Sequence, residues 1–520
     1  MKVLQESRSK GKHIENLLFL CFMILGIAAR VWRFGAVPGG INQDEAYAAY
    51  EAYSLLHYGM DSNGYAFPVY LEAWGSGMNA LNTYLMIPFI ALFGLKSWVI
   101  RMPQLLVACL TLWAVYLLIQ KLWNERAALC VLFLLAVAPW HIMLSRWGLE
   151  SNLAPGFLTF GLFFWVKGLE KPKFFVLSAL MYGLSLYCYA TIWPVVPVLL
   201  LLQLVYCVFM KKMSFTKEVL IAGILLFVMA FPLLLFLLVN CGMMEEIRLS
   251  FFSVPKMGHM RASEISLSNI IPNIKNTIYI LKNQTDGLIW NGMDKYGIYY
   301  LFTTAFFVFG LFLFVVRAGR KLVKKEFSFE VLLLIQLMAG AILGLLINVN
   351  VNRINIIFLP MIMLAAGGIY YLGEMTDMRL LAIPFAAYVI AFGCFEKDYF
   401  TEYDSQLSKW FAYGMEEALE EIDYHEGTVY VDAISAYPRI LYYEQIPVTE
   451  YLDTVNLVDY PGGARDIVSF DRFQFFFDRD NLDKQGIYLL EKDVDMTPYT
   501  DKDFVWKEFA YYVVAIPISE

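Results

Sequence analysis

The chain has 520 residues, of which 59% are hydrophobic and 17% are charged, and its formal net charge is −7. Soluble proteins carry about 25% charged residues, so this composition excludes an ordinary soluble protein and indicates a polytopic membrane protein. The net charge says little about partners, because basic residues concentrate in short loops and acidic residues in the C-terminal tail. The seven cysteines lie in or beside apolar stretches, so we expect no disulfide framework.

About eleven apolar runs can cross a membrane, at roughly 20 residues per span with some shorter. They lie near residues 16–34, 98–119, 126–142, 154–169, 173–190, 191–210, 217–239, 297–317, 330–348, 353–372 and 379–396. The first run follows a basic N-terminus and has no small-residue cleavage site, so we expect an uncleaved anchor. A shorter run at 81–94 contains Pro88 and could be another crossing or a helix along the surface.

The distribution of Lys and Arg favours the surface helix. The basic connectors at 121–126, 167–173, 211–217 and 317–325 fall on one side only if 81–94 does not cross. The positive-inside rule makes that side cytoplasmic, together with the N-terminus. We therefore predict an α-helical, multi-pass cell-membrane protein with about eleven spans plus outer juxtamembrane helices. Residues 1–396 form the transmembrane domain, whose main outer loops are 35–97 and 240–296.

The chain changes character after residue 396. Charged residues become frequent, and β-type runs at 428–432, 440–443 and 511–516 alternate with polar or helical stretches such as 415–422. This pattern is typical of a small α/β domain. By parity of the spans, we expect the domain at 397–520 to be extracytoplasmic.

The first outer loop carries an acidic pair, Asp44 and Glu45, in the first turn of a predicted helix. A carboxylate at the edge of a membrane is costly unless it is solvated, paired or bound to a cation, so the pair is a candidate site. The alternative is a solvated loop start, or a helix N-terminus that favours negative charge. Glu51, on the same helix, is expected to be a solvated surface residue. Glu72, beside Trp74, is a second candidate carboxylate or simply an interfacial acid.

Three arginines lie at the predicted outer boundary, namely Arg101, Arg146 and Arg353. The guanidinium group offers a planar fork of donors that suits phosphate, so each is a candidate ligand of a lipid phosphate. The alternatives are snorkelling to headgroups for Arg101 and Arg353, and a pair along one helical turn between Arg146 and Glu150.

The second long outer loop contains an amide- and aromatic-rich segment at 283–292, which includes Trp290 and Asn291. Such side chains suit sugar recognition, although loops of this composition are common. We find no Walker loop, dinucleotide fingerprint or metal-binding Cys/His cluster in the sequence. A cytoplasmic nucleotide-sugar substrate is therefore not supported, and no nucleic-acid partner is expected.

The order of these features resembles the membrane glycosyltransferases of the GT-C class. The resemblance is to the superfamily of protein O-mannosyltransferases and aminoarabinose (lipid A) transferases, glycosyltransferase family 39-like and of bacterial type. It covers about residues 14–370, and its most specific stretches are 39–53, 67–74, 93–103 and 146–150. The His-Pro-Pro or Glu-Lys-Pro signature of those branches is replaced by Glu72-Ala-Trp-Gly.

The resemblance implies a GT-C fold and a polyprenyl (undecaprenyl) phosphate sugar donor. The sugar would pass with inversion to a cell-envelope acceptor, which could be a glycan, a lipid or a protein, on the outer face of the membrane. Asp44 is then the expected general base, and Glu45 orients the site. Arg353, with Arg146 and Arg101 behind it, would stabilise the leaving phosphate.

The same resemblance implies further contacts. Tyr47, Glu72, Trp74, Trp290 and Asn291 are the expected substrate-binding residues. Asp44 and Glu72 would hold a divalent metal cation if the reaction uses one, since carboxylates suit hard ions. Two alternatives remain open, a transporter or flippase of lipid-linked sugars and a non-catalytic scaffold for envelope assembly.

Overall fold

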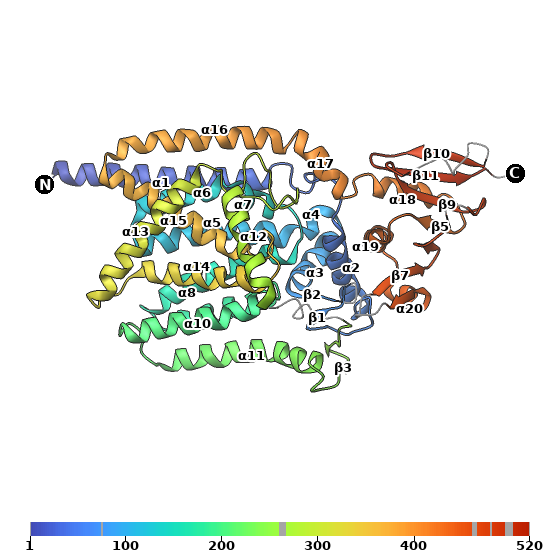
Figure 1. Cartoon of the computed structure of the whole chain (residues 1–520), viewed down its shortest axis with the longest axis horizontal. Helices are drawn as coiled ribbons and strands as arrows, with labels where there is room; N and C mark the ends of the chain where they lie inside the picture. The colour runs from blue at the N-terminus through green and yellow to red at the C-terminus, as the bar shows by residue number, and fades with distance from the viewer. Residues whose placement is uncertain are drawn as a thin grey trace.

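The computed structural model describes residues 2–73, 76–258, 267–459, 465–478, 481–494 and 503–518. It has two parts, a bundle of long helices that includes the N-terminus and a β-rich domain that includes the C-terminus (Figure 1). Helices α2 (Gln43–Tyr58) and α3 (Leu81–Phe93) lie between these parts. The predicted mostly helical protein with a C-terminal β-containing domain is confirmed.

Each of the eleven predicted spans coincides with a helix. These helices are α1 (Lys2–Val31), α5 (Met102–Leu122), α6 (Glu125–Ala136), α8 (Ala154–Gly168), α9 (Phe174–Ser185), α10 (Ile192–Phe209), α11 (Lys217–Asn240), α13 (Thr303–Val323), α14 (Phe329–Leu346), α15 (Phe358–Met375) and α16 (Ala382–Tyr399). In the described part of the chain, seven helical segments are long and apolar enough to cross a membrane. Helices α6, α8 and α9 have 12, 15 and 12 residues and are too short for that criterion.

Helix α15 is the centre of the bundle. It packs against α6, α8, α13 and α14. Of the most apolar stretch within Asn355–Met375, 94% is buried. By contrast, only 17% of the most apolar stretch of each of the outer helices α1, α11 and α16 is buried. An apolar outer surface of this kind matches a bundle surrounded by lipid.

The run at 81–94 forms α3, which has 13 residues. This length is below the roughly 20 residues that a span needs. Helix α3 packs against α2 at the end of the bundle that faces the C-terminal domain (Figure 1). The structure thus places this run beside the first outer loop and not among the long helices.

Short elements complete the loops. They are β1 (Tyr70–Leu71), β2 (Met78–Asn79), α4 (Ser97–Ile100), α7 (Pro139–Leu144), β3 (Ile247–Leu249), β4 (Phe252–Val254) and α12 (Ile270–Asn283). Helix α2 begins with a capping box, in which Asn42 and Glu45 satisfy each other's backbone N–H groups. It ends at Gly59, which adopts a left-handed conformation with φ of +73°. Both ends of α2 are therefore set by local sequence.

The C-terminal domain contains a mixed seven-stranded sheet of order β10-β11-β9-β5-β8-β7-β6. Its elements are α17 (Glu402–Trp410), α18 (Met415–Ile422), β5 (Val429–Val431), α19 (Tyr437–Glu444), α20 (Val448–Thr454), β6 (Asn456–Asp459), β7 (Arg465–Phe470), β8 (Phe473–Gln474), β9 (Ile487–Glu491), β10 (Phe504–Glu508) and β11 (Tyr512–Pro517). Strand β5 is parallel to β8 and β9, and the other pairs are antiparallel.

The predicted strands at 428–432 and 511–516 and the helix at 415–422 are confirmed by β5, β11 and α18. The strand expected at 440–443 is wrong, because this run lies in helix α19. Pro438 occupies the first turn of α19, where its fixed φ favours a helix start. Ile440 and Leu441 are buried, and α19 packs against α2. Tertiary packing therefore outweighs the β propensity of this run.

One hydrophobic cluster joins the C-terminal domain to the first outer loop. It includes Tyr47 and Tyr50 of α2 together with Ile440 of α19 and Val514 of β11. Backbone contacts reinforce it, since the N–H of Ile41 donates to the carbonyl of Phe411. The Tyr50 hydroxyl also donates to the carbonyl of Ile446 at 2.8 Å. The domain that begins after α16 is therefore seated on the loop that carries the acidic pair.

Substitutions of Gly40 and Gly59 by alanine test the contact between the C-terminal domain and the first outer loop. The two glycines share a positive φ, but only Gly40 packs against the C-terminal domain. A Cβ atom at Gly40 (φ +76°) would overlap the carbonyl oxygen of Phe411, whereas at Gly59 (φ +73°) it meets nothing within 4 Å. We expect Gly59→Ala to cost about 1–2 kcal/mol of unfolding free energy from backbone strain alone. Gly40→Ala should cost about 1–3 kcal/mol more, because it also overpacks the junction.

Thermal unfolding of the detergent-solubilised protein measures both effects, and limited proteolysis reports release of the C-terminal domain. Equal losses of stability in the two variants would show that the contact at Gly40 does not hold the domain.

Candidate functional site

The two carboxylates of the acidic pair have different surroundings. Glu45 is fully buried, and its side chain forms an ion pair with Arg101, with 2.5 Å between Oε1 and Nη2. Its Oε2 accepts the backbone N–H of Gly148 at 2.6 Å, and its Oε1 accepts that of Asn42 at 3.1 Å. Protein donors thus engage both oxygens of Glu45, which places this residue in the framework of the site.

Asp44 lines a cavity of about 430 Å³, which we call the Asp44 cavity. Trp147 and Trp290 contribute from the membrane domain, and Lys409 and Arg439 contribute from the C-terminal domain. The ring of Trp290 packs edge-on against Trp410, with 5.4 Å between ring centroids. The structure therefore brings together two of the predicted site residues, Asp44 and Trp290, that are far apart in the sequence.

Asn291 does not line this cavity. Its side chain is buried and donates to Oδ2 of Asp286 at 2.7 Å, and the same oxygen accepts the N–H of Val351 at 2.8 Å. Asp286 thereby ties the loop that holds Trp290 to the loop between α14 and α15. The expected contact between Asn291 and the substrate therefore stays a prediction.

Arg101 and Arg146 are fully buried, and the protein occupies their donors. Besides Glu45, Arg101 donates to the carbonyls of residues 35, 38 and 40. Arg146 donates to the carbonyls of residues 29, 30, 32, 33 and 37, and not to Glu150. These carbonyls include those at the end of α1, which a helix leaves unsatisfied. The expectation that these two arginines bind phosphate is corrected, because their guanidinium groups hold the chain between α1 and α2.

Arg353 has different surroundings, since it is only half-buried. It lies in the loop between α14 and α15, and its Nη1 donates to the carbonyl of Asn348 at 3.2 Å. Its backbone N–H donates to Oδ1 of Asn350 at 2.8 Å. The preceding residue, Asn352, lines the Asp44 cavity. Of the three predicted phosphate ligands, Arg353 is thus the one that keeps exposed surface beside this cavity.

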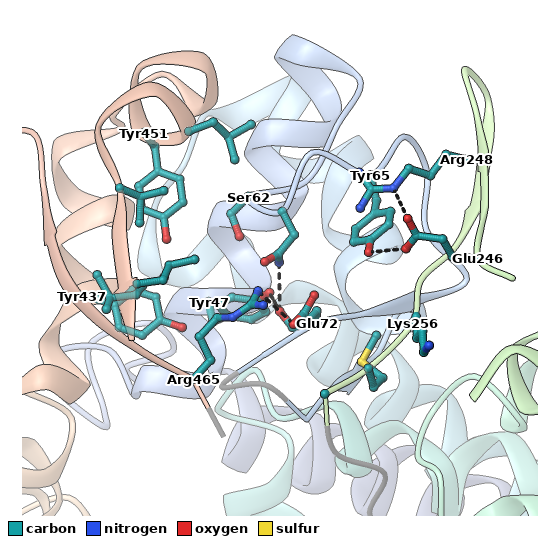
Figure 2. Close-up of a pocket in the computed structure, with 17 residues that line it drawn as sticks. Tyr47, Ser62, Tyr65, Glu72, Glu246, Arg248, Lys256, Tyr437, Tyr451 and Arg465 are labelled. Carbon is teal, nitrogen blue, oxygen red and sulfur yellow. Dashed lines mark hydrogen bonds and ion pairs between the residues drawn. The ribbon is translucent and has the colours of Figure 1, made fainter. Parts of the chain in front are cut away.

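Tyr47 and Glu72 line a second cavity of about 580 Å³, which we call the tyrosine cavity (Figure 2). The Tyr47 hydroxyl donates to the backbone carbonyl of Glu72. The Glu72 carboxylate lies 3.2 Å from Nη1 of Arg465, which belongs to β7. Burial raises the pKa of Glu72, and the charge of Arg465 opposes this shift. Trp74 lies outside the described residues.

Residues of α2 line both cavities, since Asp44 lines one and Tyr47 lines the other. Tyr47 follows Asp44 by three residues, which places the two side chains on neighbouring positions of one helix face. Tyr437 lines the tyrosine cavity. Its pKa is raised well above the usual range, first by burial and also by nearby negative charges that include Asp44. Asp44 is therefore within electrostatic reach of both cavities.

The geometry does not support the expected metal site. Asp44 and Glu72 line different cavities. In the described ranges, no group of three or more His, Cys, Asp or Glu side chains could hold a metal ion. Asp44 and Glu72 therefore share no cavity among the described residues, and their expected role as metal ligands stays a prediction.

Sequence reasoning missed the residues that the C-terminal domain contributes. Lys409 and Arg439 line the Asp44 cavity, and Tyr437, Tyr451 and Arg465 line the tyrosine cavity. No local pattern marks these residues, because their role depends on how the domain is seated on α2. The change in composition after residue 396 identifies a domain but not the surface that it covers.

Two buried carboxylates, Glu51 and Asp61, lie behind the tyrosine cavity. Glu51 is fully buried, so its expected place on a solvated surface is wrong. Its Oε2 accepts the N–H of Ser62 at 2.8 Å, and Oδ1 of Asp61 accepts the N–H of Tyr65 at 2.7 Å. Burial raises the pKa of both carboxyl groups, and the charge of Glu51 raises that of Asp61 further.

Comparison with known proteins identifies the fold. The family model described as dolichyl-phosphate-mannose-protein mannosyltransferase matches residues 81–236. Two similar solved structures are of ArnT from Cupriavidus metallidurans, in the apo state and bound to undecaprenyl phosphate. They share 11% and 12% identity with the chain, each with a TM-score of 0.53, and the matches cover 98% of both chains. The curated proteins contain no sequence match.

A third structure is the oligosaccharyltransferase AglB from Archaeoglobus fulgidus in complex with an inhibitory peptide and a dolichol-phosphate. It shares 12% identity with a TM-score of 0.49, and the match covers 83% of this chain but only 64% of AglB. The ArnT structures confirm the predicted fold. The family match includes the predicted stretches at 93–103 and 146–150, whereas those at 39–53 and 67–74 lie outside it.

The buried Glu51 predicts a pH-dependent stability. Its pKa is raised from an ordinary value of 4.5, so the folded protein retains a proton that the unfolded chain has released. The free energy of unfolding therefore falls as the pH rises above about 4.5, and the fall ends once the folded protein also ionises. We expect Glu51→Gln to raise the thermal midpoint at about pH 8 and to have little effect near pH 4.5.

Thermal unfolding across this pH range tests the prediction, with Glu420→Gln as the control because Glu420 is exposed on α18. A Glu51→Gln variant that is destabilised equally at both pH values would contradict the account of a buried, raised-pKa carboxyl.

Proposed function

We propose that this GT-C superfamily protein transfers a sugar from a polyprenyl-phosphate donor to a cell-envelope acceptor on the outer face of the membrane. The observation that carries the proposal is that the two carboxylates of the acidic pair have different surroundings. Glu45 is held by Arg101 and Gly148, while the neighbouring Asp44 lines a cavity. That ArnT binds undecaprenyl phosphate and shares this fold over 98% of its length supports the choice of donor.

Asp44 acts as the general base in the proposed reaction. It takes the proton of an acceptor hydroxyl while that oxygen attacks the anomeric carbon of the donor sugar. The bond between the anomeric carbon and the phosphate oxygen breaks, and the electron pair leaves with the lipid phosphate. Because the attack comes from the side opposite the leaving group, the configuration at the anomeric carbon inverts. The departing phosphate is weakly basic, so no general acid is needed.

Arg353 stabilises the charge that develops on the departing phosphate. Its loop is tied to the Trp290 loop through Asp286, which keeps the proposed cation and the proposed sugar-binding ring together. Asp44 approaches the cavity lined by Trp290 and Asn352 from α2. The proposed base and the proposed phosphate ligand thus come from different elements.

Neither alternative accounts for these features as directly. A transporter or flippase needs access from both faces, whereas both cavities that hold predicted residues adjoin the C-terminal domain. A scaffold does not require a carboxylate in a cavity next to a half-buried arginine. We further propose that the N-terminus is cytoplasmic and that the C-terminal domain lies outside, as the distribution of basic loops indicates.

The first test of the function is Asp44→Asn. The amide has the shape of the carboxylate but is not a base, so we expect turnover to fall by about 10²–10⁴-fold. Binding of undecaprenyl phosphate should be unchanged. Transfer of labelled sugar from a panel of undecaprenyl-phosphate sugars to membrane acceptors measures the activity.

Glu45→Gln is the matched control for that test. It should lower the thermal midpoint, because it removes the charged partner of a buried arginine, while Asp44→Asn should leave the midpoint unchanged. Full turnover by Asp44→Asn would remove Asp44 as the base.

The second test is Arg353→Ala. Loss of a charge-assisted contact to the donor phosphate should weaken binding of undecaprenyl phosphate by about 1.5–3 kcal/mol. Arg320→Ala serves as the control, because Arg320 is exposed near the end of α13. If Arg353→Ala bound the lipid phosphate as tightly as Arg320→Ala, Arg353 would be a headgroup-facing residue without a role in the donor site.

A further inference from the structure

We propose that the tyrosine cavity binds a saccharide of the acceptor and that this saccharide carries an anionic group. The identification of the bound saccharide as the acceptor rests on the proposed function. It assigns a role to the C-terminal domain, which would recognise the acceptor and hold it beside α2.

The walls of the cavity suit a carbohydrate. Four tyrosines line it, namely Tyr47, Tyr65, Tyr437 and Tyr451 (Figure 2). Tyrosine presents an apolar ring that covers the C–H face of a sugar and a hydroxyl that bonds to sugar hydroxyls. The volume of about 580 Å³ lies within the range of roughly 300–1,000 Å³ typical of small-molecule sites.

The charge of the lining favours an anion. The cavity is lined by three cationic residues, Arg248, Lys256 and Arg465, and by two carboxylates, Glu72 and Glu246. Carboxylates orient both arginines, since Arg248 lies 2.9 Å from Glu246, and Arg465 lies 3.2 Å from Glu72 and 2.8 Å from Asp459 outside the lining. The described lining is therefore positive by one charge. A guanidinium fork matches the planar geometry of a carboxylate or a phosphate.

The position of the cavity fits an acceptor site. Tyr47 lies three residues from Asp44 on α2, a rise of about 4.5 Å along the helix. The Asp44 carboxylate is among the charges that raise the pKa of the Tyr437 phenol. A saccharide that fills the tyrosine cavity can thus present a hydroxyl to Asp44, while the Asp44 cavity receives the donor sugar from the side of Trp290 and Asn352.

Three segments build the cavity, and they are distant in the sequence. Tyr65 and Glu72 come from the first outer loop, and Arg248 and Lys256 come from the second. Arg465 of β7 comes from the C-terminal domain and joins the first loop through its ion pair with Glu72 (Figure 2). The acceptor would therefore be bound only when all three segments are in place.

Binding of defined saccharides to the full-length protein in detergent tests the proposal without requiring turnover. The probes are a uronic-acid disaccharide, a disaccharide phosphate and the matching neutral disaccharide, measured by saturation-transfer NMR and calorimetry. At least one anionic probe should bind tenfold or more tightly than the neutral one. Preference for the uronate or for the phosphate identifies the anionic group.

Lys256→Ala and Arg465→Gln should each weaken the anionic probe at least fivefold. Lys256 is exposed, so its variant preserves the fold even if Arg465→Gln does not. Lys295→Ala is the control, because Lys295 pairs with Asp398 and lines neither cavity. Equal binding of anionic and neutral probes, or no binding of any probe, would overturn the proposal. It would also fail if Lys256→Ala weakened undecaprenyl phosphate and not the saccharide, since the cavity would then belong to the donor.

Asp44→Asn separates this proposal from the proposed reaction. The variant should bind the saccharide as wild type does, because Asp44 does not line the tyrosine cavity. If Asp44→Asn kept full turnover while the anionic saccharide still bound, the proposed base would fail and the acceptor site would stand. If Asp44→Asn abolished transfer and no saccharide bound, the reaction would stand and the acceptor site would fail.

Discussion

The buried ion pair between Arg101 and Glu45 is the constraint on which the structure around α2 depends. Removing two charges from water is costly unless every donor and acceptor is satisfied. Here Arg101 also donates to carbonyls of the loop that follows α1, and Glu45 also accepts the N–H of Gly148. Three segments that are distant in the sequence therefore meet at one point. Because Glu45 is fixed in the first turn of α2, the direction of Asp44 is fixed as well.

The C-terminal domain depends on the same loop. The carbonyl of Gly40 accepts from Arg101, and the next residue, Ile41, bonds to Phe411 and Arg439 of the C-terminal part. The loop between α1 and α2 is thus held by Arg101 of the helical bundle and by Arg439 of the C-terminal domain. This explains why residues of the C-terminal domain complete both cavities, although the domain is separate by composition.

The sequence predicts what depends on local pattern. Apolar runs predict the positions of the long apolar helices, since burial in lipid requires them. Asp44 and Trp290, both singled out from the sequence, line one cavity. The sequence does not predict whether Arg146 faces a cavity or the carbonyls of α1, because either environment suits a guanidinium group. The same limit explains the helix at Ile440, where packing on α2 decides the structure of a run with β propensity. The sequence also does not predict that Asp44 and Glu72 line different cavities, since sequence proximity does not fix which cavity each side chain reaches.

The placement of the proposed base has a consequence for the order of the reaction. Asp44 lies on a helix that is buried on most sides, so it is held rigidly, whereas Arg353 lies in a loop and keeps exposed surface. A rigid base, Asp44, and a more accessible phosphate ligand, Arg353, suit one order of binding. The lipid-linked donor enters from the membrane side after the acceptor has bound beside the C-terminal domain. The base then lies where the two substrates meet, and α2 separates their binding cavities until the sugar is transferred.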